Sequence, residues 1–261
     1  MDFTLKKYRD LVSALKDVGY EFVSYADYAE GKRAERLVVM RHDVDRSMNR
    51  ALRMAQVERE LGVKASYYLR EKFIDDDSDE IRYIESLRHE VGYHYEELVS
   101  EKGDVDKAYA RFVRNIEQMR QVVDVRTITM HGSPMSGIDS KEMWREYDYR
   151  ELGLIGEPQL DVDWREMVYQ TDTGRSWCGI SRRDKVADRA LAWKAKGWVY
   201  ETTDDMIKAV REGKFPNCVM MTSHPQRWTD NMCEWMRELV MQRVKNVIKR
   251  ILFVTFVIAQ K

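Results

Sequence analysis

The sequence predicts an α/β protein in which helices cover a sheet of parallel strands. Buried-looking apolar runs alternate with amphipathic helical segments along most of the chain. All five histidines lie in or beside segments where such a strand ends. No repeat, low-complexity stretch or Pro/Gly/Ser-rich linker divides the 261 residues, which favours a single domain over residues 1–261. A barrel and an open doubly wound sheet both fit this alternation.

The first half of the chain predicts four helices and three strands. The first helix places Leu5, Tyr8 and Leu11 on one face. Ser47 and Ser78 are the expected N-caps of the second and third helices. Helices are expected at 4–18, 47–61, 77–90 and 104–122, and strands at 37–44, 63–70 and 91–98.

The second half predicts four more strands and two helices. The helix at 202–213 opens on a cap-like Thr-x-x-Asp and stops at Gly213. A long helix follows from about residue 230. Strands are expected at 125–134, 164–170, 197–201 and 217–225.

Composition excludes several classes of function. Lys plus Arg (44) nearly balances Asp plus Glu (45), so a net charge of −1 gives no reason to expect a nucleic-acid partner. The chain has no glycine-rich nucleotide loop and no Gly-x-Ser-x-Gly elbow. Its three cysteines are widely spaced, and its N-terminus carries charges throughout. We therefore expect a cytoplasmic protein.

Polar residues gather where the predicted strands end. The segments are "RHDVD" (41–45), "RHEVGYHYEE" (88–97), "TMHGSP" (129–134) and "TSHP" (222–225). Because the carboxyl ends of parallel strands face one crevice, we expect their acids and imidazoles to meet there, although each could instead be satisfied locally. His89, near the end of a helix, is expected to cap that helix's carbonyls. The residues expected to converge are Asp43, Asp45, His94, Glu96, His131 and His224.

These residue types predict metal-assisted hydrolysis. A divalent cation binds imidazole and carboxylate ligands while one position stays open, and there it activates water and polarises a carbonyl. Asp43 and Asp45 are two residues apart, as are His94 and Glu96, so each pair lies on one face of its strand. A nearby carboxylate can act as base and a histidine as acid.

The order of "RHDVD", "HEVGYHYEE", "MHGSP" and "SHPQRW" resembles the polysaccharide deacetylases, carbohydrate esterase family 4, whose NodB-homology fold is a distorted (β/α)7 barrel. The resemblance covers about residues 35–230 and implies that Asp43 is the general base, that Asp45 and His94 are metal ligands, and that His224 protonates the leaving group. The second histidine of the family's second motif is Leu98 here. Glu96 and His131 are then the candidates for the third ligand.

The resemblance implies an enzyme that removes an acetyl or formyl group from the nitrogen of an amino sugar, with Zn²⁺ as the expected cofactor. We expect the substrate to be a nucleotide- or lipid-linked precursor of surface polysaccharide or lipopolysaccharide. The alternatives are an amidohydrolase for a small non-sugar amide and a non-catalytic carbohydrate-binding relative. We expect a group of aromatic and charged residues to contact the substrate, although the tryptophans could equally belong to the hydrophobic core. The residues concerned are Arg41, Asp172, Arg175, Trp177, Arg227 and Trp228.

The segment 230–261, a helix with an apolar tail, allows two interpretations. Its apolar run, 251–259, follows four basic residues and is too short to span a bilayer. It could lie against an anionic membrane surface at the inner face of the membrane, or it could close the domain as a buried helix or strand.

Overall fold

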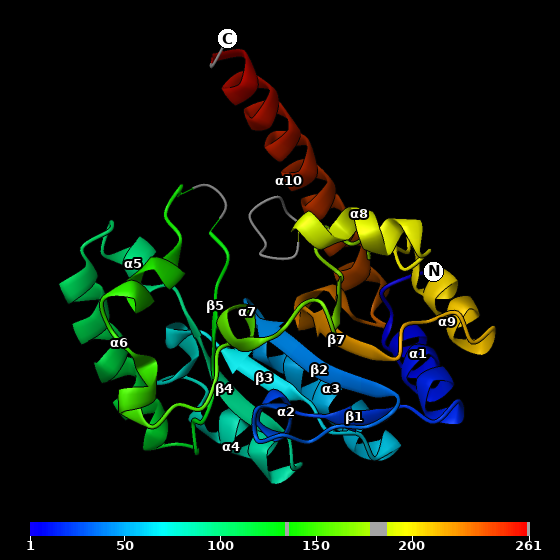
Figure 1. The fold of residues 1–261 in the computed structure, drawn as a ribbon, viewed down its shortest axis with the longest axis horizontal. Helices are drawn as coiled ribbons and strands as arrows, with labels where there is room; N and C mark the ends of the chain where they lie inside the picture. The colour runs from blue at the N-terminus through cyan, green and yellow to red at the C-terminus, as the bar shows by residue number, and fades with distance from the viewer. Residues whose placement is uncertain (134–135, 178–186, 260–261) are drawn as a thin grey trace.

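The computed structural model describes residues 1–133, 136–177 and 187–259, with the side chains of 187–188 and of 248 onward left out. The described part contains seven strands in one sheet, and every pairing is parallel (Figure 1). The order is β5-β4-β3-β2-β7-β6, and β1 pairs with the first half of β2. The strands are β1 Glu21–Val23, β2 Leu37–Val44, β3 Ser66–Leu69, β4 Glu90–Tyr95, β5 Ile128–Met130, β6 Val168–Thr171 and β7 Cys218–Ser223.

Helices surround this sheet (Figure 1). Helix α1 packs against both α3 and α9, and α6 packs along β4. The bounds are α1 Leu5–Asp17, α2 Tyr25–Ala29, α3 Met48–Leu61, α4 Ser78–Ser86, α5 Glu97–Ser100, α6 Val105–Arg120, α7 Pro158–Asp161, α8 Ala187–Ala195, α9 Thr203–Arg211 and α10 Met232–Ala259. The predicted α/β class with a parallel sheet is confirmed, and six of the seven strands of the sheet, β2 to β7, lie at predicted positions. Within the described residues the sheet stays open, because no ladder joins β5 to β6.

Local signals located most of these elements. β2 matches the predicted strand 37–44 residue for residue, and all eight of its side chains are buried because both faces of the sheet are covered. The Oγ1 of Thr202 caps α9 in a capping box with Asp205, as its Thr-x-x-Asp sequence predicts. α1 begins after Thr4, whose hydroxyl accepts a hydrogen bond from the Lys7 amide.

Two predicted strands and one predicted helix are corrected, and two short elements were not predicted. The segment 197–201 is not a strand, because the Trp198 amide donates to the Trp193 carbonyl at the end of α8 and the Trp198 carbonyl accepts from Gln170. β5 has only three residues of the expected 125–134. The strand β1, with three residues, and the helix α2, with five, were not predicted, since both are too short for a periodic signal. The helix expected at 77–90 ends at Ser86.

The expected serine caps are also corrected. Ser47 occupies the N-cap position of α3, but its side chain makes no capping hydrogen bond. Ser78 is the first residue of α4, whose N-cap is Asp77.

The strand register brings the carboxyl ends of the strands to one edge of the sheet. Asp43 of β2 pairs with Tyr68 of β3, and His94 of β4 pairs with Thr129 of β5. On the other side of β2, His42 pairs with Ser223, the last residue of β7. Side chains that follow these strands therefore lie around a common point, as the sequence predicts.

Helix α10 runs away from the body of the protein to the end of the chain (Figure 1). Among the helices formed by described residues, none combines the length and apolar character required for a membrane crossing. The side chains of the apolar run 251–259 lie outside the described residues.

Candidate metal centre and its surroundings

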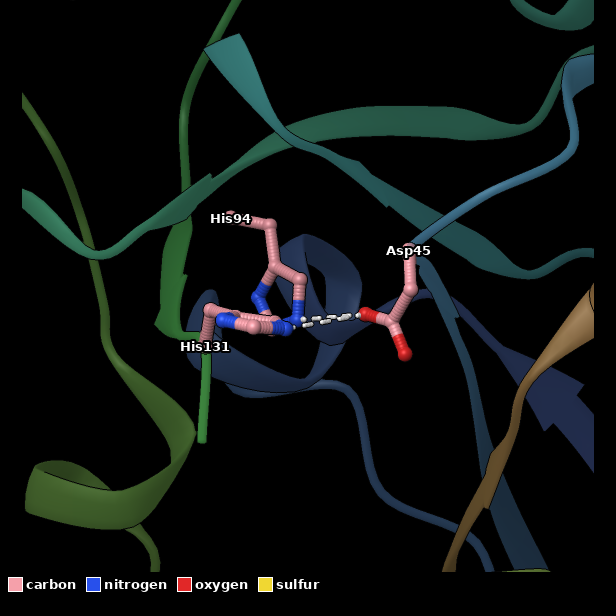
Figure 2. Close-up of side chains that lie close together, drawn as sticks. All are labelled: Asp45, His94 and His131. Atoms are coloured by element: carbon pink, nitrogen blue, oxygen red, sulfur yellow. Dashed lines mark ion pairs between the residues drawn. The ribbon is translucent and has the colours of Figure 1, made fainter. Parts of the chain in front are cut away.

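Three side chains from three strand ends converge on one point (Figure 2). Asp45 follows β2, His94 lies at the end of β4, and His131 follows β5. The Oδ1 of Asp45 is 3.6 Å from the Nε2 of His94 and 3.5 Å from the Nε2 of His131. Ligand atoms about 2.0–2.1 Å from a tetrahedral zinc ion stand roughly 3.3 Å apart, so these spacings suit a common cation.

The hydrogen bonds around Asp45 and His94 leave the converging atoms available. The Oδ2 of Asp45 accepts a hydrogen bond of 2.9 Å from the side-chain amide of Gln226. Its Oδ1 is buried and accepts no hydrogen bond from the part of the chain that the structure describes. The Nδ1 of His94 lies 3.0 Å from the carbonyl oxygen of Thr129, which fixes the proton on Nδ1 and leaves the Nε2 lone pair for a ligand.

Glu96 makes an ion-pair contact with the Nδ1 of His131. Its Oε2 lies 2.7 Å from the Nδ1 of His131, and its Oε1 pairs with Arg70. Burial acts to raise the pKa of Glu96, but His131 and Arg70 outweigh it and lower that pKa to about 2. The ionised carboxylate therefore directs the Nε2 of His131 toward Asp45.

The geometry distinguishes between the two candidates for the third ligand. His131 is the residue that joins Asp45 and His94, whereas Glu96 contacts His131 from behind. Leu98, in the place of the family's second histidine, is buried in the hydrophobic core on α5. The third donor thus comes from the segment after β5 and not from the segment that follows His94.

Asp43 lies beside this group and is held by Arg41. The Nε and Nη2 of Arg41 donate to the two carboxylate oxygens at 2.7 and 2.8 Å. The Oδ2 of Asp43 is 3.8 Å from the Nε2 of His94. Burial acts to raise the pKa of Asp43, but Arg41 and then His94 outweigh it, so the pKa is lowered and the group is an anion at neutral pH.

His224 enters from the other side, after β7. Its Nδ1 is 2.6 Å from the Oδ1 of Asp172, and its backbone amide donates to Oδ2 of the same residue. Asp172 also accepts from the indole N–H of Trp228 at 2.8 Å and pairs with Arg227. Burial acts to raise the pKa of Asp172, yet Arg227 and His224 lower it to about 2. A buried anion thus holds His224 through its Nδ1, and Nε2 is the ring nitrogen left for proton exchange.

Five of the six residues expected to contact the substrate are buried in the protein, and Arg175 is half-buried. Asp172 is fully buried beneath His224, and Arg41 is buried against Asp43 and over the Tyr68 ring. Arg175 is half-buried and stacks over Phe3 and Trp235. Three others are also buried: Trp177, Arg227 and Trp228. This burial suits the alternative of core packing for the tryptophans, and contact of the six residues with a substrate stays a prediction.

Sequence reasoning missed Gln226 and Arg70. Gln226 lies in "SHPQRW", immediately after the residues that carry the motif, and only its contact with Asp45 reveals its role. His89 is a correction: its Nε2 lies 3.1 Å from the carbonyl of Ala55 in α3, so it does not cap the carbonyls of its own helix.

No family model matches the chain, and no curated protein matches it. Solved structures with a similar fold include BA3943, a CE4 family pseudoenzyme from Bacillus anthracis, at 12% identity and a TM-score of 0.44, over 82% of this chain and 63% of that one. The chain therefore covers less than two thirds of that structure's length. PdaA of Bacillus subtilis, a family 4 carbohydrate esterase, matches at 13% identity and a TM-score of 0.44, over 90% of this chain and 83% of that one.

A third match is the catalytic domain of a peptidoglycan N-acetylglucosamine deacetylase from Eubacterium rectale, at 11% identity and a TM-score of 0.47, over 82% of this chain and 87% of that one. At these identities and TM-scores the matches assign no activity to the chain, so an assignment of activity depends on the site. The first two of these three structures are described as carbohydrate esterase family 4 proteins.

Proposed function

We propose that this protein is a metal-dependent hydrolase that removes an N-acyl group from an amino sugar. The observation that carries the proposal is the buried Oδ1 of Asp45, which faces two imidazole nitrogens and has no hydrogen-bond donor among the described residues. Unpaired buried oxygens are costly, and a divalent cation satisfies one. Two imidazoles and a carboxylate form a donor set typical of zinc.

Asp45, His94 and His131 would hold the cation, which when bound activates solvent and polarises the acyl carbonyl. Asp43, ionised beside Arg41, accepts a proton from the attacking water. The water oxygen bonds to the acyl carbon, and the carbon–nitrogen bond of the amide breaks. His224 donates a proton from Nε2 to the departing nitrogen, and Asp172 stabilises its protonated form. The products are a carboxylic acid and a free amino sugar.

His224 interacts electrostatically with both aspartates of the first motif. Its charge acts on both Asp43 and Asp45 and helps to lower the pKa of each. Base and acid thus approach the candidate metal centre from β2 and β7, two adjacent strands. This arrangement suits amide hydrolysis, in which the attacking water loses a proton and the leaving nitrogen gains one.

The substrate is proposed as an acetylated or formylated amino sugar in a nucleotide- or lipid-linked precursor of surface polysaccharide, met in the cytoplasm. The resemblance of the motifs supports the sugar.

The test combines metal analysis with a substrate panel on purified protein. We expect about one zinc per chain by plasma mass spectrometry and amine release from N-acetyl or N-formyl amino sugars, free and nucleotide-linked. The variant Asp45→Asn should lose both, whereas Asp76→Asn, on an exposed loop, should keep both. Turnover of ureides or cyclic imides alone would instead assign a small-amide hydrolase. A metal-free protein that turns over none of the panel would contradict the proposal.

A further inference from the structure

Helix α10 buries polar side chains and exposes apolar ones. Toward the body of the protein it buries Glu238 and Gln242, which are 5% and 6% exposed. One turn later Asn246 donates a hydrogen bond to the Gly174 carbonyl and accepts one from Gln242. A helix that packs on a globular body normally directs its apolar face inward, so this orientation is the reverse of the usual one.

The exposed side of α10 carries a continuous aliphatic stripe. Its members are about half exposed and follow one another at intervals of four, four and three residues, which places them on one face of the helix. A single exposed aliphatic residue needs no explanation, but four on one face form a surface that a partner can cover. The stripe consists of Met236 (49%), Val240 (56%), Val244 (53%) and Val247 (54%).

Charge indicates what covers the stripe. After Glu238 the chain has no acidic residue, whereas Arg243, Lys245, Lys249 and Arg250 follow within twelve residues. The next nine residues, "ILFVTFVIA", carry no charge. A second copy of the helix would bring like charges together. It would also cover only one face of the uncharged segment 251–259. An anionic lipid surface would attract the basic residues and accept the apolar ones.

We propose that the Met236–Val247 stripe docks α10 on a membrane surface that contains anionic lipids, with the helix lying at the interface. The proposal is independent of the hydrolase activity, because none of the proposed ligands or proton-transfer residues lies on α10.

The test is co-sedimentation of the full chain with vesicles of phosphatidylcholine, with and without phosphatidylglycerol. We expect binding to the phosphatidylglycerol vesicles, with a decline at high salt because the attraction is screened. The double variant Val240→Gln/Val244→Gln should bind about tenfold more weakly. Leu191→Gln, which changes a 79% exposed leucine on α8, is the matched control and should bind like the unchanged protein.

A second variant tests the charge argument separately. Arg243→Gln/Arg250→Gln should weaken binding to the anionic vesicles about fivefold for each charge removed. Absence of binding by the unchanged chain would overturn the proposal. Binding of both double variants at the level of the unchanged chain would overturn it too. Light scattering that shows a dimer abolished by Val240→Gln/Val244→Gln, without vesicle binding, would overturn it in favour of a second copy.

Discussion

At the scale of the residue, the candidate metal centre depends on which atom of each side chain is already engaged. An imidazole has two nitrogens, and in His94 and His131 the Nδ1 is turned to the Thr129 carbonyl and to Glu96. A carboxylate has two oxygens, and in Asp45 the Oδ2 is taken by Gln226. These contacts turn the remaining atoms toward one another, so the site is organised before a cation binds.

The variant Glu96→Gln should weaken zinc binding by about 10–100-fold, since a neutral amide orients His131 less well than the carboxylate. Competition with a chromophoric chelator measures this affinity without reference to activity. Glu117→Gln, an exposed change on α6, is the control and should leave the affinity unaltered. Equal affinity of Glu96→Gln and the unchanged protein would remove Glu96 from the support of the site.

The variant His224→Gln should lower kcat about 10²–10⁴-fold, the range expected for loss of a general acid, with little change in metal content. Steady-state kinetics on the best substrate of the panel, with metal analysis of the same sample, measures both. Loss of the metal together with kcat would show instead that His224 belongs to the binding of the cation.

At the scale of the element, the site requires close approach of β3, β4 and β5. Tyr68 of β3 crosses over Gly92 of β4 and lies 2.8 Å, Oη to Oγ1, from Thr127 just before β5. A Cβ at Gly92 would lie 2.6 Å from the Cδ1 of Tyr68 and 2.8 Å from the Thr127 carbonyl oxygen. Such contacts are shorter than real side chains show, so glycine is required for packing at this position.

The variant Gly92→Ala should destabilise the protein by about 1–3 kcal/mol, because the Tyr68 ring and the Thr127 backbone must move away from β4. It should also weaken metal binding, since His94 is two residues further along the same strand. Urea denaturation measures the free energy of unfolding. Gly132→Ala, where a Cβ would meet open space, should cost little stability, and equal losses in the two variants would contradict this account.

At the scale of the whole molecule, one buried carboxylate connects the helices to the sheet. Glu58 of α3 is fully buried and accepts hydrogen bonds from Tyr8 of α1 and from Tyr67 of β3, the latter at 2.6 Å. The Nε2 of His42, on β2, lies 2.7 Å from the same carboxylate, and His89 lies 3.7 Å away. Burial acts to raise the pKa of Glu58, but His42 and then His89 and Tyr67 lower it to about 2.

Because the pKa of Glu58 is about 2 when folded and 4.5 ordinarily, its contribution to stability is complete above about pH 4.5 and is lost as the pH falls through 2. The variant Glu58→Gln should lower the free energy of unfolding at neutral pH by about 3–5 kcal/mol and should flatten its decline in acid. Urea denaturation at a series of pH values measures both effects. The control Glu60→Gln removes an exposed ion pair with Arg9 and should cost at most about 1 kcal/mol. If the free energy of unfolding of Glu58→Gln declined in acid as steeply as that of the unchanged protein, Glu58 would not be the group responsible for the decline.

The sequence by itself determined most of the strands and longer helices, and the gathering of acids and imidazoles at strand ends. β2 and the cap of α9 were predictable because alternation and capping involve neighbours in sequence. The convergence of Asp45 and His94 was predictable because parallel strands align their carboxyl ends.

Only the tertiary structure decided which atoms are free and which faces are covered. It selected His131 over Glu96 beside Asp45, placed Asp172 under His224, and turned the aliphatic side of α10 outward. The physical reason is that a side chain's free lone pair, or a helix's exposed face, is set by partners from distant parts of the chain. Gln226, for example, contacts Asp45 across 181 residues, a distance over which no local pattern extends.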